Sequence, residues 1–237
     1  MQRIVNPFVY DQIRKHRMPN PTIPAWLDET YSQCYEDIFI RKTLEAYILR
    51  NKLNSLQLSY IEIGGNHPVC TSASFLYYNQ FGANGIIVEP DPKLAENLRK
   101  FRPRDRIIEA AVVDTDEKEI EFYVSTENEL STAVPEFVEK NRLTTQKIKV
   151  QTIRVNSILE MLDVESLLLS IDVEGLDLRI LKDIDFTKHR PHINTIEPSE
   201  HIVPGTSMAI IDFLKEKEYR LIGKNYVNLI FEDLRKG

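Results

Sequence analysis

Cysteine is scarce in this chain of 237 residues, which contains only Cys34 and Cys70. Small secreted domains rely on dense cysteine frameworks, and thiolate zinc sites need closely spaced cysteine pairs. Neither pattern occurs in the sequence. The scarcity excludes a disulfide scaffold, disfavours a thiolate zinc site and predicts a reducing compartment, which we take to be the cytoplasm.

Long apolar runs are also lacking, since none approaches the ~20 residues that a transmembrane helix needs. The mean hydropathy is −0.31, and the first seven residues, Met-Gln-Arg-Ile-Val-Asn-Pro, contain no apolar segment of the signal-peptide kind. We therefore expect no membrane span. The length suits one full-sized domain with an appended segment.

An excess of positive charge is absent as well, because 30 Lys and Arg face 36 Asp and Glu, for a net charge of −6. Nonspecific nucleic-acid binding needs a basic face, so we predict no nucleic-acid partner. The densest basic cluster comprises Arg99, Lys100, Arg102, Arg104 and Arg106. It lies where a helix is expected to end, and the helix dipole explains it more simply than a partner does.

Strand-like and helix-like segments alternate along most of the chain. The segments predicted as strands are 58–63, 85–89, 106–113, 119–124, 148–155, 167–172 and 193–197. The expected helices are 31–52, 93–100, 156–162, 176–183 and 207–217. Such alternation predicts an α/β fold in which helices cover both faces of a parallel sheet.

Both ends of the chain depart from this alternation. Two further strands, 219–223 and 226–231, are separated by only two residues, too few for a parallel crossover, so they are expected to form an antiparallel hairpin. Pro19, Pro21 and Pro24 exclude a continuous helix near the start. We predict an N-terminal accessory or lid segment at 1–55, which could equally be a dimer contact in a homo-oligomer, and a catalytic domain at 56–237.

Glycine is too sparse after the first strand for a dinucleotide site. The segment Tyr60-Ile-Glu-Ile-Gly-Gly-Asn-His67 contains Gly64 and Gly65 but lacks the third glycine of G-x-G-x-x-G. Ligands of doubly wound sheets bind at this carboxyl end of the first strand. S-adenosylmethionine carries no phosphate, and Glu62 suits its ammonium or sulfonium charge. A tight structural turn is the alternative interpretation.

Glu89 ends the next strand, about 25 positions beyond the glycines, where an acidic residue accepts hydrogen bonds from ribose hydroxyls. Pro90 follows and stops the strand. The alternative is a solvated carboxylate. We assign the predicted cofactor-binding residues as Glu62, Gly64, Gly65, Asn66, Glu89, Pro90, Ala111 and Asp172.

Carboxylates also follow two later strands. Asp172 and Glu174 come after the apolar strand 167–172, and Glu197 ends the strand 193–197, so these side chains are expected at the same edge as the glycines. A hydroxyl acceptor must lose its proton to a general base or have its pKa lowered by a metal ion, and oxygen ligands suit Mg²⁺ or Mn²⁺. Alternatively, Asp172 caps the following helix.

We predict four catalytic residues and a metal site at the first two of them: Asp172, Glu197, His201 and His67. The histidines are candidate bases because imidazole titrates near neutral pH. Residues 32–37 are expected either to fold over the cofactor or to cap the first helix. The loop 129–133 is either an acceptor-side loop or an ordinary connection.

Four motifs in this order resemble the FkbM family of methyltransferases: Tyr31–Asp37, Ile63–Pro68, Val88–Pro92 and Ile171–Asp177. The resemblance implies methyl transfer from S-adenosylmethionine to an acceptor hydroxyl, in a family often associated with glycans and other natural products. The chain departs from the family at Glu62, where Asp is common, at Gly65, where Ala is common, and at Tyr35, where Gly is usual.

The predicted fold is therefore α/β: a doubly wound, mostly parallel seven-stranded sheet with an antiparallel C-terminal hairpin, the Rossmann-like layout of class I methyltransferases. The predicted function is S-adenosylmethionine-dependent O-methylation of a sugar or glycan hydroxyl. The alternatives are a lipid, small-metabolite, peptide or nucleotide acceptor, or a noncatalytic nucleotide-binding module. A dehydrogenase is disfavoured by the missing glycine and the terminal hairpin.

Overall fold

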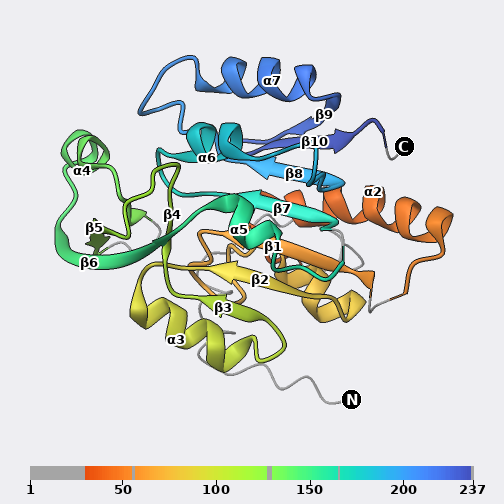
Figure 1. Ribbon diagram of the computed structural model, residues 1–237, viewed down its shortest axis with the longest axis horizontal. Coiled ribbons are helices and arrows are strands. Elements are labelled where there is room, and N and C mark those ends of the chain that lie inside the picture. Colours follow the sequence, from red (N-terminus) through yellow and green to blue (C-terminus); the bar gives the residue numbers. More distant parts are fainter. Residues whose placement is uncertain (1–29, 55–56, 127–129, 165, 236–237) are drawn as a thin grey trace, which may run out of the picture.

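The computed structural model describes residues 30–54, 57–126, 130–164 and 166–235. Its centre is a seven-stranded sheet with the order β3-β2-β1-β7-β8-β10-β9 (Figure 1). These strands are β1 (Ser59–Ile63), β2 (Asn84–Val88), β3 (Arg106–Ile108), β7 (Leu168–Ile171), β8 (Ile193–Ile196), β9 (Tyr219–Lys224) and β10 (Leu229–Asp233). The pairs from β3 to β8 are parallel, whereas β10 is antiparallel to β8 and to β9. The predicted fold class is confirmed.

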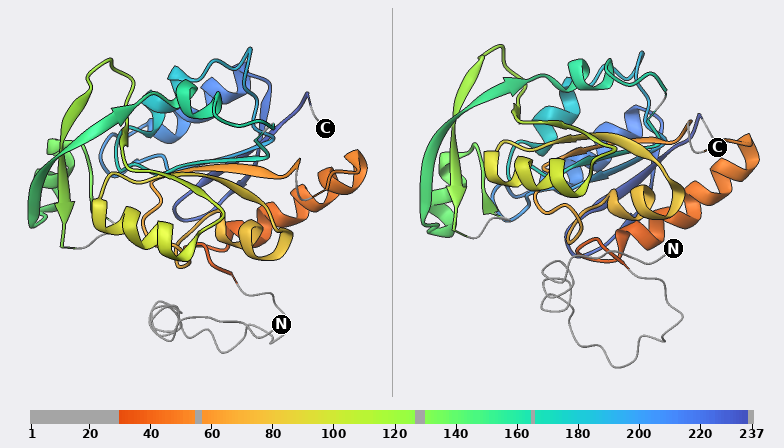
Figure 2. Two further views of the ribbon diagram at one scale, coloured as in Figure 1. Left: turned by 60° about the horizontal axis from the view of Figure 1, so that its bottom comes forward. Right: turned by 90° about the horizontal axis from the view of Figure 1, so that it is seen from below.

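Helices cover both faces of this sheet (Figure 2). They are α2 (Glu36–Asn51), the π-helix η2 (Tyr77–Phe81), α3 (Pro92–Phe101), α5 (Val155–Leu159), α6 (Asp177–Asp183) and α7 (Thr206–Glu216). Buried residues of α5, α6 and α7 form one core with Ile61 and Ile63 of β1. Those of α2, η2 and α3 form a second core with Tyr60, because successive strand residues point to opposite faces.

Local signals explain where α3 and α2 begin. Asp91 caps α3 by accepting a hydrogen bond from the Lys93 amide at 2.8 Å, and Pro92 occupies the first turn. The helix α2 starts at Glu36, later than the predicted residue 31, because Tyr35 has a φ of 65° that interrupts the helical path. The Ser32 hydroxyl still accepts from the Asp37 amide at 3.2 Å, as a capping side chain does.

The predicted strand 106–113 is wrong as a single element. It divides into β3 and β4 (Ala111–Val112), and β4 joins a second, three-stranded sheet of order β4-β6-β5. Its other strands, β5 (Glu119–Ser125) and β6 (Thr145–Ile153), pair antiparallel and are joined through α4 (Pro135–Asn141). The exposed charged residues along β5 and β6 explain why these strands leave the doubly covered main sheet.

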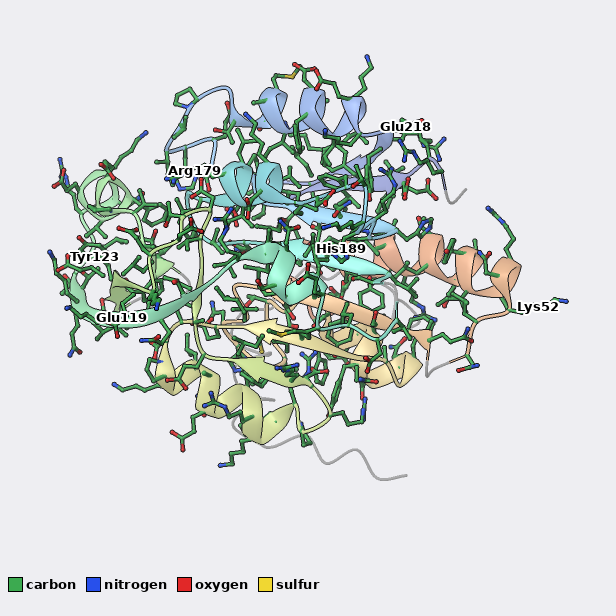
Figure 3. All side chains as sticks on the ribbon, viewed as in Figure 1. Lys52, Glu119, Tyr123, Arg179, His189 and Glu218 are labelled. Atoms are coloured by element: carbon green, nitrogen blue, oxygen red, sulfur yellow. The ribbon has the colours of Figure 1, made fainter. Side chains whose placement is uncertain are left out.

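This second sheet projects from one end of the main sheet, where Glu119 and Tyr123 are labelled in Figure 3. Pro19, Pro21 and Pro24 lie outside the described residues, so the predicted division at residue 55 stays a prediction. Among the described residues, no helix is long and apolar enough to cross a membrane.

Candidate functional site

The carboxyl ends of four adjacent strands place Gly64, Glu89, Asp172 and Glu197 at one edge of the sheet. Each residue directly follows its strand, and its backbone amide continues the hydrogen bonding to the neighbouring strand. The Gly64 amide donates to Val88 O at 3.0 Å, and the Asp172 amide donates to Ile63 O at 3.0 Å. These four sequence-predicted residues therefore share one edge, as the parallel topology requires.

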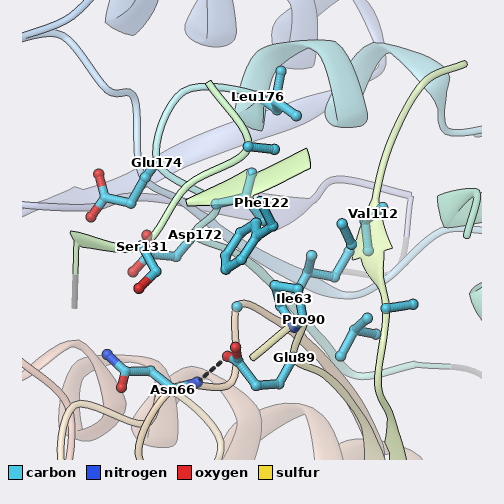
Figure 4. Close-up of a pocket in the computed structure, with 16 residues that line it drawn as sticks. Ile63, Asn66, Glu89, Pro90, Val112, Phe122, Ser131, Asp172, Glu174 and Leu176 are labelled. Atoms are coloured by element: carbon cyan, nitrogen blue, oxygen red, sulfur yellow. Dashed lines mark hydrogen bonds between the residues drawn. The ribbon is translucent and has the colours of Figure 1, made fainter. Parts of the chain in front are cut away.

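A first cavity, which opens to solvent, lies over this edge (Figure 4). Six of the predicted cofactor residues line it: Gly64, Asn66, Glu89, Pro90, Ala111 and Asp172. Val112 and Phe122 add apolar walls from the β4 and β5 side. The second sheet therefore contributes one wall to a cavity built at the end of the first.

Glu89 is buried in this first cavity, with only 4% of its surface exposed. One carboxylate oxygen accepts from the Asn66 amide at 2.8 Å, and the other accepts from the Asp91 amide at 2.8 Å. Burial raises the pKa of Glu89 to about 7, although these backbone bonds oppose the shift. Each oxygen keeps a further lone pair that can accept a ligand hydroxyl.

The two glycines have different surroundings. Gly64 has a φ of 89°, and a Cβ there would lie 1.8 Å from the backbone oxygen of Asp172. At Gly65 a Cβ would meet Ile87 and Leu98 side chains at 2.3 and 2.9 Å. Gly64 thus permits a close approach at the cavity, whereas Gly65 permits close packing of α3 against the strand below it.

Glu62 and His67 are not among the described residues that line a cavity. The Glu62 carboxylate accepts from the Ser72 hydroxyl at 3.0 Å, the Ala73 amide at 2.9 Å and the Ser74 hydroxyl. His67 Nδ1 accepts from the Val69 and Cys70 amides at 3.1 and 2.9 Å. Both side chains therefore organise the loop that follows Gly65.

A second cavity continues from the first and also opens to solvent. The two cavities share Gly64, Asn66, Asp172 and Glu174. The rest of the second cavity is formed by Gln33, Thr71, Leu130, Glu197, Pro198, Ser199, Glu200, His201, Tyr226 and Val227. Two ligands, one in each cavity, would therefore contact each other at the shared residues.

Three carboxylates gather at this junction: Asp172, Glu174 and Glu197 each offer an oxygen within 4.8 Å of the others. Burial, followed by the charge of Glu197, raises the pKa of Asp172 well above its ordinary value. Burial and the charge of Glu174 raise the pKa of Glu197 to about 8. Such a cluster suits a proton acceptor or a hard cation. Glu174 is thus a third candidate ligand of the predicted metal site, beside Asp172 and Glu197.

The N-cap position of α6 is Leu176 rather than Asp172, and the turn before this helix is organised by its first residue, Asp177. Its carboxylate accepts from the Val173 amide at 2.9 Å, the Gly175 amide at 3.1 Å and the Ser199 hydroxyl at 2.9 Å. These bonds hold the turn between β7 and α6. Asp172 precedes this turn and lines both cavities.

Residues from near both ends of the described chain line the second cavity. Glu36, which is buried, accepts from the Cys34 amide at 2.9 Å and from the side-chain amides of Asn225 and Asn228 at 3.1 and 3.3 Å. Glu36 thereby fixes the segment that carries Gln33 against the β9–β10 turn that carries Tyr226. Sequence reasoning missed Asn225 and Asn228, which carry no motif.

The FkbM methyltransferase domain model matches residues 62–221. The chain therefore belongs to the FkbM family of S-adenosylmethionine-dependent methyltransferases. The protein that contains the two cavities is therefore a methyltransferase.

The chain is similar in structure to the N-terminal domain of human METTL16, at 10% identity and a TM-score of 0.44, covering 88% of this chain and 72% of that one. It is also similar to an RNA methyltransferase from Salinibacter ruber solved with S-adenosyl-L-homocysteine, at 9% identity and a TM-score of 0.35, covering 81% and 90%. No curated protein matches the sequence at a significant level.

Proposed function

We propose that this methyltransferase transfers a methyl group from S-adenosylmethionine, bound in the first cavity, to a hydroxyl of a sugar or glycan bound in the second. The observation that carries the proposal is the junction, where the cavities share Gly64, Asn66, Asp172 and Glu174. Methyl transfer is an in-line displacement that depends on positioning donor and acceptor side by side.

The first cavity fits the cofactor in the chemistry of its residues. The Glu89 carboxylate can accept from ribose hydroxyls, and Pro90, Ala111, Val112 and Phe122 offer apolar surface to an adenine ring. The acidic junction favours a cationic sulfonium. When bound, S-adenosylmethionine supplies an electrophilic methyl group, and the residues of this chain orient it.

The acceptor hydroxyl must lose its proton during transfer, and the carboxylate cluster lies where that proton is released. Asp172 and Glu197 are our candidate proton acceptors, because burial raises the pKa of both toward the working range of a base. His201 also lines the second cavity and makes an edge contact with Phe137 at 5.6 Å. We assign His67 to the support of its loop.

A divalent ion offers a second route to the same deprotonation. Three carboxylate oxygens within 4.8 Å of one another match the oxygen ligands that Mg²⁺ and Mn²⁺ prefer. Turnover that disappears with EDTA and returns with Mn²⁺ would assign Asp172, Glu174 and Glu197 as ligands. Turnover that is indifferent to EDTA would leave the carboxylates as the base.

The lining of the second cavity supports an uncharged acceptor that is rich in hydroxyl groups. None of its described lining residues is a lysine or an arginine, which disfavours nucleotides and other phosphorylated acceptors. Its aliphatic surface is limited to Leu130, Pro198 and Val227, which is little for an acyl chain. Most of its lining residues carry hydroxyl, amide or carboxylate groups instead, and these suit the hydroxyls of a sugar.

The proposal is tested by methyl transfer from labelled S-adenosylmethionine to a panel of free sugars, glycosides and oligosaccharides, with sugar phosphates, lipids, peptides and nucleotides for comparison. Label in neutral saccharides supports the proposal. Label confined to another class would replace the acceptor. Cofactor binding without label in any class would favour a noncatalytic module.

A further inference from the structure

A buried arginine lies behind the two cavities. Arg102 is the C-cap residue of α3 and has no exposed surface, so its guanidinium makes specific buried contacts beyond the helix-end placement that the sequence predicts. Its guanidinium donates to Asp105 Oδ2 at 2.8 Å, Pro68 O at 3.1 Å, Ser72 Oγ at 3.3 Å, Tyr60 Oη at 2.8 Å and Ser74 Oγ at 2.9 Å.

Three of these bonds hold residues 66–74, which we call the cradle loop. The Ser72 and Ser74 hydroxyls accept from Arg102 and donate to the Glu62 carboxylate. The loop is therefore fixed between a buried cation and a buried anion. Hydrogen bonds to charged groups are stronger than neutral ones, and they are directional, so they fix orientation as well as position.

The cradle loop needs such support because its backbone is strained. Asn66 and Thr71 have φ values of 40° and 60°, in a region that residues with a Cβ seldom adopt and that is unusual for a β-branched residue. Strained residues persist only where the surroundings over-determine them. Asn66 lines both cavities and Thr71 lines the second.

The remaining contacts fix Arg102 itself. Asp105 also accepts from the Tyr60 hydroxyl at 2.6 Å and from the Gly85 amide at 2.9 Å, so it is anchored to both β1 and β2. The guanidinium lies 5.7, 5.3 and 4.6 Å from the ring centroids of Tyr60, Phe75 and Tyr78. A lysine has neither the planar shape nor the number of donors to replace these contacts.

We infer that Arg102 is a positioning residue for both ligands, although it lines neither cavity. It holds Pro68, Ser72 and Ser74 so that Asn66 and Thr71 keep their strained conformations toward the cavities. The effect reaches Glu89, because the Asn66 amide donates to that carboxylate. The inference rests on the proposed cofactor site and adds control of that site from residues behind it.

The test compares Arg102→Lys and the double variant Ser72→Ala/Ser74→Ala with the wild type. Arg99→Gln is the matched control, because Arg99 precedes Arg102 by one turn of α3 but is exposed and pairs with Glu109. Calorimetry measures the affinity for S-adenosylhomocysteine, and hydrogen exchange measures protection of residues 66–74. Strands β2 and β8 report on the rest of the fold.

We expect Arg102→Lys and Ser72→Ala/Ser74→Ala to exchange faster at residues 66–74. Both should bind S-adenosylhomocysteine about tenfold or more weakly, because charge-assisted hydrogen bonds are lost. Strands β2 and β8 should stay protected, and Arg99→Gln should behave like the wild type. If Arg102→Lys fails to fold, the serine variant decides. Unchanged loop exchange, or protection lost equally across the sheet, would overturn the inference. If the wild type binds no S-adenosylhomocysteine, the proposed function fails, while loop exchange still tests the role of Arg102.

Discussion

Gly64 lies against the backbone carbonyl of Asp172 so closely that a Cβ at Gly64 would come within 1.8 Å of its oxygen. The two residues end the neighbouring parallel strands β1 and β7, whose register pairs Ile63 with Ile171. Both also line both cavities. The glycine therefore determines how near the loop after β1 comes to the carboxylate cluster.

Gly64→Ala and Gly205→Ala form a matched pair of substitutions, because Gly205 has a similar φ of 91° but nothing within 4 Å of an added Cβ. Both alanines lose about 1–2 kcal/mol to the left-handed backbone. We expect Gly64→Ala to lose a further ~1–3 kcal/mol from the clash with Asp172. Urea unfolding measures both, and equal losses would contradict the contact.

Glu89→Gln should weaken the binding of S-adenosylhomocysteine by about 1–3 kcal/mol, because an amide cannot accept on both sides as a carboxylate does. Glu96→Gln on the exposed face of α3 is the control and should bind normally. Calorimetric titration compares the three proteins. An unchanged affinity in Glu89→Gln would remove Glu89 from the cofactor site.

The pH dependence of binding should follow Glu89. Its pKa of about 7 leaves it largely protonated below that pH in the free protein, whereas ribose hydroxyls bind best to the carboxylate. Affinity for S-adenosylhomocysteine should be level above pH 7 and should fall by up to about tenfold per pH unit below it. The Glu89→Gln variant should lack this dependence, and a wild-type profile in that variant would refute the assignment.

Stability should depend on pH in the opposite sense. The pKa of Glu89 is raised from 4.5 to about 7 on folding, so between these values the folded state binds more protons than the unfolded state. The contribution of Glu89 to the free energy of unfolding is fully present below pH 4.5. It decreases by roughly 3 kcal/mol as the pH rises through 7. Relative to wild type, Glu89→Gln should gain stability over this window in urea unfolding.

Asp172→Asn should leave folding and cofactor affinity nearly intact and lower kcat by roughly 10²–10⁴-fold, the range for loss of a general base. Asp163→Asn, at an exposed position before β7, is the control. Single-turnover methyl transfer to the best saccharide of the panel gives the rate. Wild-type turnover in Asp172→Asn would exclude Asp172 from the proton transfer.

Tyr226→Ala should raise the KM for the saccharide acceptor several-fold without changing the affinity for S-adenosylhomocysteine. Tyr226 is 98% exposed and lines the second cavity. Its turn is fixed by Asn225 Oδ1, which accepts from the Val227 and Asn228 amides at 2.9 and 2.6 Å. Met208→Ala removes an exposed apolar side chain elsewhere. Equal KM values in the two variants would show that Tyr226 does not contact the acceptor.

The sequence predicts the residues at the edge of the sheet better than the hydrogen-bond network that supports them. Gly64, Glu89, Asp172 and Glu197 are recognisable because each follows an apolar strand, and parallel strands bring such positions together. Whether Glu62 faces the ligand or the loop depends instead on Ser74 and Arg102, which only the tertiary fold brings near it. The motif predicts Glu62 as a cofactor-binding residue, and the structure shows its carboxylate accepting from Ser74, whose hydroxyl accepts in turn from Arg102.

The division of 106–113 into two strands was equally hidden, since its apolar residues suit either a continuous strand or one that changes sheets. The wall of the second cavity was hidden for another reason. Glu36 meets Asn225 and Asn228 across 189 and 192 residues of sequence, and nothing local marks such a pairing.

The most direct test of the proposed cofactor site is calorimetric titration of the wild type and Glu89→Gln with S-adenosylhomocysteine and with NAD. We expect the wild type to bind S-adenosylhomocysteine and not NAD, and Glu89→Gln to bind S-adenosylhomocysteine at least several-fold more weakly. Binding of NAD alone, or equal binding of S-adenosylhomocysteine by both proteins, would contradict the assignment of the first cavity as the cofactor site.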